Sequence, residues 1–471
     1  MNDLPVTAPR SLFPTRLGRL AMAGFALACV VLGRPVVLAA GERPQLSERT
    51  SEELGKLKEM ADAKNWEAAL RLLANLQADT NPDSYDSAFI SQIKAKILME
   101  KGDYANAIEP MEFALRSSDS HDYLEARDTQ ELVYYLANLY YQEASTTKSP
   151  PLQQQYFTKA ADYAQRWLQA SPKPGQDQMR QEVQLLFVTI LYNQAVINPE
   201  HVNLALIKKA QVEIENALVR INRPKETFYV LLIAALQNQG DYARAADLLE
   251  LLVRQYPAKK EYWAQLVPIY LNLAQDKDAD KARAYNTCSI ITIERAQALG
   301  LMKTPKENFN LVGLYFNAGQ FGKATELLHS GLKNGAIAAE QKNWELLAYS
   351  YQQVDKPYQA IEALKEATQQ FPAAGQLDFQ IATIYSSLDK TEEAYRYLTA
   401  AVAKGRLDHP AKAYYFLAYV SFELAKFNEA LVAVDKAVAT SGAEKESQLP
   451  QLKQAIEDAI RERSQAAPQT Q

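Results

Sequence analysis

Apolar and small residues between Trp344 and Pro372 follow the spacing of two successive helices. One group lies 3, 4 and 7 residues after Trp344, and a second lies 16, 20 and 23 residues after it. Such spacings place side chains on one face of an α-helix, and a proline favours the end of the second segment. The pattern therefore predicts two amphipathic helices packed against each other. The positions concerned are Leu347, Ala348, Tyr351, Ala360, Leu364 and Ala367.

The same pattern recurs along the chain, and a small residue early in each second helix marks each copy. Successive markers are separated by 38, 53, 50, 35, 44, 35, 36, 34 and 36 residues, which gives a basic period near 35. The longer intervals predict insertions at 145–155 and 275–286, and the register of 173–215 stays open. The markers are Ala69, Ala107, Ala160, Ala210, Ala245, Ser289, Ala324, Ala360, Ala394 and Ala430.

Over residues 52–445 this pattern resembles the tetratricopeptide repeat (TPR). The resemblance implies an all-α fold, a right-handed TPR superhelix of about ten helix-turn-helix repeats, because one helix pair cannot bury its apolar face alone. We expect an irregular array with insertions at 52–223 and a more regular array at 224–445. A capping helix at 446–463 carries apolar residues at helical spacing, and a disordered tail follows at 464–471. The apolar residues of the cap are Leu449, Leu452, Ile456 and Ile460.

The N-terminus has the pattern of a secretory signal peptide, residues 1–39, followed by a linker at 40–51. Arg10, Arg16 and Arg19 precede an apolar run, Leu20–Leu32, that is too short to span a bilayer. The small residues around Ala39 predict cleavage after Ala39 or Ala40.

Two other interpretations of the N-terminus remain open. A lipoprotein would carry its lipid on Cys29, although the usual leucine three residues earlier is missing. An uncleaved inner-membrane anchor from Leu20 to Ala40 would bury Arg34, which is costly. All three interpretations place the body of the protein outside the cytoplasm, and we expect it in the periplasm.

Composition and motifs argue against several functions. The formal net charge of −5, without a basic stretch, argues against nucleic-acid binding. The histidines, His121, His201, His329 and His409, are at least 80 residues apart, and no metal or phosphate-loop motif occurs. Asp276, Asp278 and Asp280 alternate like a calcium loop but lack its glycine and final glutamate, so a solvated helix–turn face is expected. The sequence predicts no enzymatic activity, no cofactor and no metal site.

Six short stretches occur in a fixed order: Glu294–Leu301, Asn310–Tyr315, Ala318–Gly319, Lys404–Leu407, Ala413–Ala418 and Phe427–Leu431. In this order they resemble the periplasmic TPR proteins encoded beside TonB, ExbB and ExbD. This resemblance implies an accessory of TonB-dependent transport across the outer membrane. It implies TonB, ExbB or ExbD components as partners and membrane association only through them. The alternative is a TPR adaptor in envelope assembly or in polysaccharide or protein export.

A second stripe on the first helix of each repeat lines the concave groove in TPR proteins, and here it holds aromatic residues. Amide side chains nearby could bond to a peptide backbone. The rival interpretation is that these rings only pack against the adjacent repeat or the cap. Phe309, Gly313, Glu345 and Tyr349 replace the Lys and Asn of the carboxylate clamp, which argues against a chaperone cofactor. The predicted groove residues are Phe309, Asn310, Asn317, Tyr349, Gln352, Phe379, Gln380, Tyr415, Tyr419 and Phe422.

Overall fold

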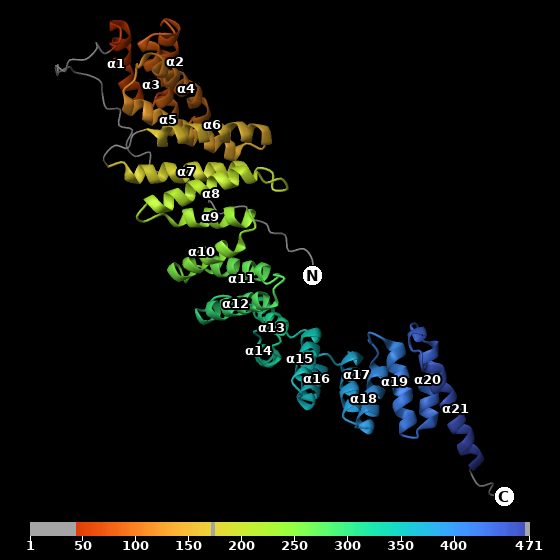
Figure 1. Cartoon of the computed structure of the whole chain (residues 1–471). Helices are drawn as coiled ribbons and strands as arrows, with labels where there is room; N and C mark the ends of the chain where they lie inside the picture. Colours follow the sequence, from red (N-terminus) through yellow and green to blue (C-terminus); the bar gives the residue numbers. More distant parts are fainter. Residues whose placement is uncertain (1–43, 171–174, 467–471) are drawn as a thin grey trace. The chain divides into compact units, whose positions relative to one another are not determined.

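The computed structural model describes residues 44–170 and 175–466, and within them it is all-helical. The chain divides into two compact units, and the division falls between Leu248 and Leu249, inside one helix. The sequence pattern, by contrast, becomes more regular from residue 224. Within each unit, helices that follow one another in sequence lie side by side (Figure 1). The predicted all-α array of helix pairs with a terminal cap is confirmed.

The helices form ten pairs followed by one further helix. Unit 1 contains α1 Glu48–Asp62, α2 Trp66–Ala78, α3 Tyr85–Lys101, α4 Tyr104–His121, α5 Ala126–Thr146, α6 Pro150–Gln169, α7 Asp177–Ala195, α8 Leu204–Arg220 and α9 Glu226–Asn238. Helix α10, Tyr242–Gln255, contains the boundary between the units. Unit 2 contains α11 Lys260–Leu273, α12 Ala279–Ala298, α13 Pro305–Asn317, α14 Phe321–Asn334, α15 Gln341–Gln353, α16 Pro357–Gln370, α17 Gly375–Ser387, α18 Thr391–Lys404, α19 Pro410–Glu423, α20 Phe427–Ala439 and α21 Leu449–Ala466.

The ten marker residues explain the packing of the pairs. Each lies in the second helix of its pair, and each is 0% exposed. A small side chain at this position lets the two helix backbones approach closely, and a large one would force them apart. The register left open between 173 and 215 is therefore settled, because Ala210 takes the marker position in α8.

Seven pairs share one turn geometry. The residue five positions before the marker has a positive φ, and the next backbone N–H donates to the carbonyl five residues back, as Lys356 does to Tyr351 at 2.9 Å. This is the hydrogen bond that closes a helix ending in a left-handed residue. The three remaining pairs, which end in α6, α8 and α12, are connected differently. The left-handed residues are Lys64, Gly102, Gly240, Gly319, Asp355, Asp389 and Ala425.

Two predicted insertions prove to be longer helices rather than inserted loops. Helix α5 continues to Thr146, and α6 begins at Pro150, so most of 145–155 is helical. Prolines fit the first positions of a helix because no hydrogen bond is required of their nitrogen there. Likewise α12 begins at Ala279, so the charged run 275–286 mostly belongs to its first turns.

The ends of the array also differ from the expected boundaries. Helix α1 begins at Glu48, inside the expected linker, because the Ser47 side chain caps it by accepting from the Thr50 N–H. Helix α21 continues to Ala466, inside the expected tail, and its Leu449 and Ile456 join the core of the last pair. The predicted signal peptide and its rivals at Cys29 and Arg34 lie outside the described residues. No helix in the described part of the chain is long and apolar enough to cross a membrane.

One half-buried carboxylate joins three helices of unit 1. Glu112 in α4 accepts hydrogen bonds from Lys159 Nζ at 2.9 Å, Tyr140 Oη at 2.8 Å and Tyr163 Oη at 3.0 Å. Burial alone would raise the pKa of Glu112, but these hydrogen bonds hold it below its usual value. The network therefore ties α4 to α5 and α6 through one ionised group.

Candidate protein-binding site

The predicted groove residues follow a fixed frame in unit 2. The frame starts sixteen residues before each marker. This position holds Asn308, Trp344 and Asp378, which are buried, and Tyr414, which is half-buried, in α13, α15, α17 and α19. One, five and eight residues later come the positions that we call the first-helix stripe. Their residues are Phe309, Gly313 and Phe316; Glu345, Tyr349 and Gln352; Phe379, Thr383 and Ser386; and Tyr415, Tyr419 and Phe422.

The central position of the first-helix stripe faces solvent in all four repeats. It holds Gly313, Tyr349, Thr383 and Tyr419, and the exposed fractions of the two tyrosines are 51% and 41%. Large rings held in water by rigid helices are available for contact with another molecule. The structure thus leaves these two predicted residues at the surface.

The flanking stripe positions hold rings that pack between repeats. Phe316 in α13 lies 6.4 Å, centroid to centroid, from Tyr349 in the next first helix. Phe379 lies 6.2 Å from Phe416 in the same way, and Phe309 is half-buried. These rings join neighbouring repeats, so the stripe combines packing with exposure.

Two rings of the last repeat lie against the cap. Tyr415 and Phe422 pack on the core cluster that includes Ile456, and Tyr415 Oη donates to Gln448 Oε1 at 3.1 Å. Tyr415 and Phe422 therefore pack against the cap, as the rival interpretation of the groove residues expects, whereas Tyr419 stays exposed. Replacing Tyr415 would therefore disturb the cap as well as any bound partner.

The predicted amide side chains border the stripe. Asn310, Asn317 and Gln352 are exposed, and Gln380 is half-buried. The Gln352 amide donates to the Ala348 carbonyl of its own helix at 3.5 Å, a long hydrogen bond. Exposed amides beside rings can both donate to and accept from the backbone of an extended segment.

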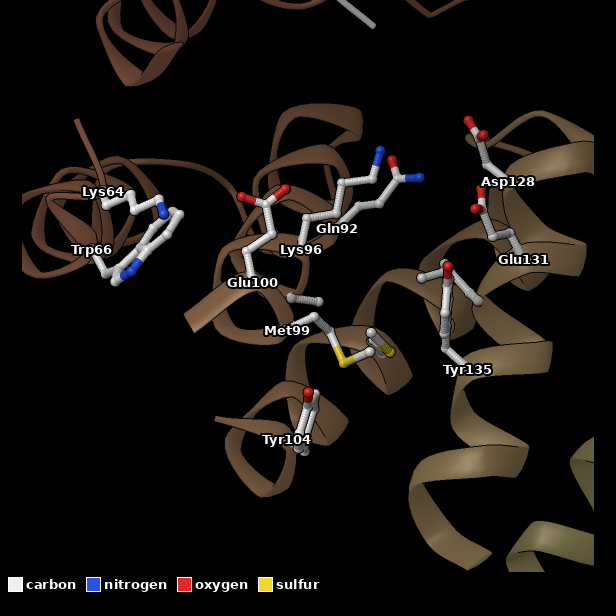
Figure 2. A pocket seen from close by; sticks show the side chains of 13 residues that line it. Lys64, Trp66, Gln92, Lys96, Met99, Glu100, Tyr104, Asp128, Glu131 and Tyr135 are labelled. Carbon is white, nitrogen blue, oxygen red and sulfur yellow. The ribbon is translucent and has the colours of Figure 1, made fainter. Parts of the chain in front are cut away.

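Unit 1 contains a second candidate surface, a hollow of about 440 Å³ between α2, α3, α4 and α5 (Figure 2). We call it the α2–α5 hollow. Ala95, Met111 and Leu132 are buried beneath it, and Trp66 and Tyr104 are half-buried at its sides. Its volume lies within the range of about 300–1,000 Å³ common for ligand sites. The remaining lining residues are Lys64, Gln92, Lys96, Met99, Glu100, Asp128, Glu131 and Tyr135.

Polar groups gather on one side of the α2–α5 hollow. The Gln92 amide points across it towards α5, which carries Asp128, Glu131 and Tyr135 (Figure 2). Burial and, less strongly, the Asp128 charge raise the pKa of Glu131, although Lys96 partly opposes them. Burial and the Glu131 charge raise the pKa of Tyr135 to about 12. Acidic side chains therefore lie here close to Lys96 in a partly desolvated place.

The sequence frame could have identified three of the residues that line this hollow. Sixteen residues before the marker Ala107 lies Ser91, and one, five and eight residues after Ser91 come Gln92, Lys96 and Met99. These are the stripe positions of the second repeat. The signal was hidden because Lys94 stands where the pattern has an apolar residue.

Other groups with reactive chemistry are engaged in the fold. Asp278 caps α12 by accepting from the N–H groups of Asp280 and Lys281, and Asp276 accepts from the Asp278 N–H. Their alternation thus belongs to a helix start. Burial and the Glu250 charge raise the pKa of the Cys288 thiol, which disfavours the reactive thiolate. No cluster of three or more metal-ligating residues occurs in the described segments.

Comparisons with known proteins return distant likenesses. No protein-family model matches this sequence, and neither does any curated protein. The crystal structure of MamA is 16% identical with a TM-score of 0.27, covering 37% of this chain and 94% of MamA. The MamA fragment from Desulfovibrio magneticus RS-1 is 13% identical with a TM-score of 0.28, and the match covers 38% of this chain and 96% of the fragment. A chain of the APC/C hetero-tetramer Cut9-Hcn1 is 14% identical with a TM-score of 0.25, and the match covers 87% of this chain and 80% of that one.

Proposed function

We propose that this chain is a non-catalytic periplasmic TPR scaffold that binds other proteins and assists TonB-dependent transport across the outer membrane. The observation that supports protein binding is the solvent-facing centre of the first-helix stripe, with Tyr349 and Tyr419 exposed by 51% and 41%. A few exposed aromatic anchors provide most of the binding energy in many interfaces. The periplasmic location and the TonB, ExbB and ExbD components as partners rest on the sequence patterns alone.

Affinity capture from crosslinked envelope extracts tests this function. The bait is the full-length chain, and the variant combines Tyr349→Ser with Tyr419→Ser. We expect the wild type to enrich TonB, ExbB or ExbD components and the double variant to lose them by about tenfold or more, since two anchors are removed. Tyr358→Ser is the matched control, because Tyr358 is 55% exposed but lies on the second helix α16.

Each other result of the capture has a definite meaning. Equal enrichment by wild type and double variant would exclude the stripe as the binding surface. Enrichment of secretion or polysaccharide-export components instead would support the alternative adaptor role. N-terminal sequencing of the same bait checks its location. A chain that begins after Ala39 or Ala40 supports export, and an intact Met1 or a lipid on Cys29 contradicts cleavage there.

A further inference from the structure

The second helix of each pair has one position that faces solvent throughout the described array. It lies two residues after the marker, and its side chain is exposed in all ten pairs. The residues are Arg71, Glu109, Asp162, Val212, Asp247, Ile291, Glu326, Glu362, Arg396 and Val432. Seven of them are charged, whereas those of α8, α12 and α20 are branched and aliphatic. Three helices therefore place an apolar side chain where the repeat otherwise places a charge.

Helix α8 extends this apolar position into a line along its outer side. Val212 and Val219 are 42% and 88% exposed, and Ala205 is exposed seven residues before Val212. Residues seven apart lie on one side of a helix, about 10.5 Å from each other. Among the ten second helices that the structure describes, only α8 has a second branched aliphatic residue seven positions after the first. We call Ala205, Val212 and Val219 the α8 outer stripe.

The charges of α8 are divided between its two halves. Lys208 and Lys209 come before Val212, and Glu213 and Glu215 come after it. Two copies of this helix that lie side by side in the same direction bring like charges together. Two copies in opposite directions bring each basic half beside an acidic half, which favours association. The charge pattern of α8 is therefore complementary to an antiparallel copy of itself.

A two-fold axis at Val212 brings matching residues of two antiparallel copies together. Lys209 lies three residues before Val212 and Glu215 three residues after it, so Lys209 comes opposite the partner's Glu215. In the same way Ala205 comes opposite the partner's Val219, and Val212 meets its own copy. Each apolar residue of the α8 outer stripe thus meets an apolar residue, as a surface that binds itself requires.

Both members of the Lys209–Glu215 pair are accessible in the single chain. Lys209 is exposed, with its Nζ 5.5 Å from the centre of the Phe187 ring. Glu215 accepts hydrogen bonds from Gln211 and Arg244, both at Oε1, and its side chain is still 37% exposed. A lysine of a second copy can therefore reach Oε2 of Glu215 while these two contacts persist.

We propose that the α8 outer stripe is an interface between two copies of this chain, with α8 packed antiparallel on α8. The valines form the apolar centre of the interface, and two Lys209–Glu215 pairs flank it. The contact between two helix faces is small, so the dimer is reversible and forms as the concentration rises. This inference goes beyond the proposed function and does not depend on it. A dimer presents two copies of the first-helix stripe to a partner, which strengthens binding to a partner with two sites.

Sedimentation velocity on the full-length chain at rising concentration tests the interface. We expect the wild type to convert from monomer to dimer. Val212→Glu combined with Val219→Glu should weaken dimerisation about tenfold or more, because carboxylates replace the apolar contact. Both valines are exposed in the single chain, so the helical content and melting temperature should not change. Val432→Glu is the matched control, since Val432 takes the same position in α20, is 56% exposed and should not affect dimerisation.

Cysteine cross-linking locates the two-fold axis. The chain's 2 cysteines, Cys29 and Cys288, are first replaced by serine. Val212→Cys should then give a disulfide-linked dimer under mild oxidation, because each introduced thiol lies beside its own copy. Glu362→Cys, at the equivalent exposed position of α16, should leave the chain monomeric.

Charge exchange tests the antiparallel direction. Lys209→Glu alone and Glu215→Lys alone should each weaken dimerisation about tenfold or more, because like charges then face each other. An equal mixture of the two variants should regain association, because each altered residue then meets an opposite charge. In a parallel dimer Lys209 faces Lys209 already, and neither single variant would weaken it. Melting temperatures check that loss of the Glu215–Arg244 ion pair leaves the fold intact.

The inference fails if the wild type stays monomeric at every concentration or if the double valine variant associates as the wild type does. It also fails if Val212→Cys and Glu362→Cys cross-link equally, or if the single charge variants associate as strongly as the wild type. None of these results affects the proposed function, because partner capture through Tyr349 and Tyr419 is measured on separate variants.

Discussion

The two units share one repeat frame but differ in helix length and in what lies between the helices. In unit 1, helices α3 to α8 are 17–21 residues long, and in unit 2, α13 to α20 are 13–14 residues long. Unit 1 contains the Glu112 network and the α2–α5 hollow, and the short-helix repeats of unit 2 pack through ring contacts such as Phe316–Tyr349 and Phe379–Phe416. The comparison shows that the buried marker fixes how a pair packs and leaves the helix ends and outer faces free to vary.

The largest effect expected is on the shared frame. Ala360→Trp should destabilise unit 2 by about 3 kcal/mol, because Ala360 is 0% exposed where α15 and α16 meet and the ring cannot be accommodated. Hydrogen exchange read by mass spectrometry should show lost protection in unit 2 and little change at α1 to α6. The control Gln369→Glu, at an exposed site of the same helix, should cost less than about 0.5 kcal/mol. A uniform loss of protection along the chain would contradict the separation into two units.

An intermediate effect is expected in unit 1. Glu112→Gln should cost about 1–2 kcal/mol, because the neutral amide loses charge-assisted hydrogen bonds from Lys159, Tyr140 and Tyr163. The lowered pKa of Glu112 means that its contribution is present above the unfolded value, about 4.3, and is lost as the pH falls through the folded value. Thermal melts of variant and wild type should therefore converge at acid pH. A constant difference at every pH would show that packing, not ionisation, is involved.

The smallest effect expected concerns a turn in unit 2. Ala425 has a φ of 54°, a conformation that costs an L-residue about 1 kcal/mol. Ala425→Gly should stabilise the protein by about 0.5 kcal/mol, since glycine removes the strain but gains entropy when unfolded. Gly319→Ala, at the equivalent turn with a φ of 69°, should act in the opposite direction. Chemical denaturation measures both, and destabilisation by both changes would contradict a common turn geometry.

The fold could be predicted because packing dictates the pattern that the sequence displays. A close helix crossing requires a small residue at a fixed place, so Ala360 and Ala430 gave the register directly. Helix ends were less predictable, since they depend on local capping. Ser149, Pro150 and Pro151 have the composition of a loop, yet the prolines occupy the first turn of α6.

The candidate site was predicted only in part. The positions of the stripe residues follow from the repeat spacing, but the exposed fraction of each side chain does not. Phe422 and Tyr419 lie on one stripe, but Phe422 packs on the cap cluster and against Phe427 and is half-buried, whereas Tyr419 stays exposed. The α2–α5 hollow arises from side chains of four helices, and the sequence does not show how they leave space between them.

The contacts between consecutive helices have a consequence for the evolution of such a chain. Most helices within each unit touch only the helices before and after them, with few contacts to the next but one. Duplication or deletion of a whole pair, such as residues 341–374, would leave the cores of distant pairs intact. The array can thus gain or lose length in modular steps that change the distance between two docking points while preserving the chemistry of each.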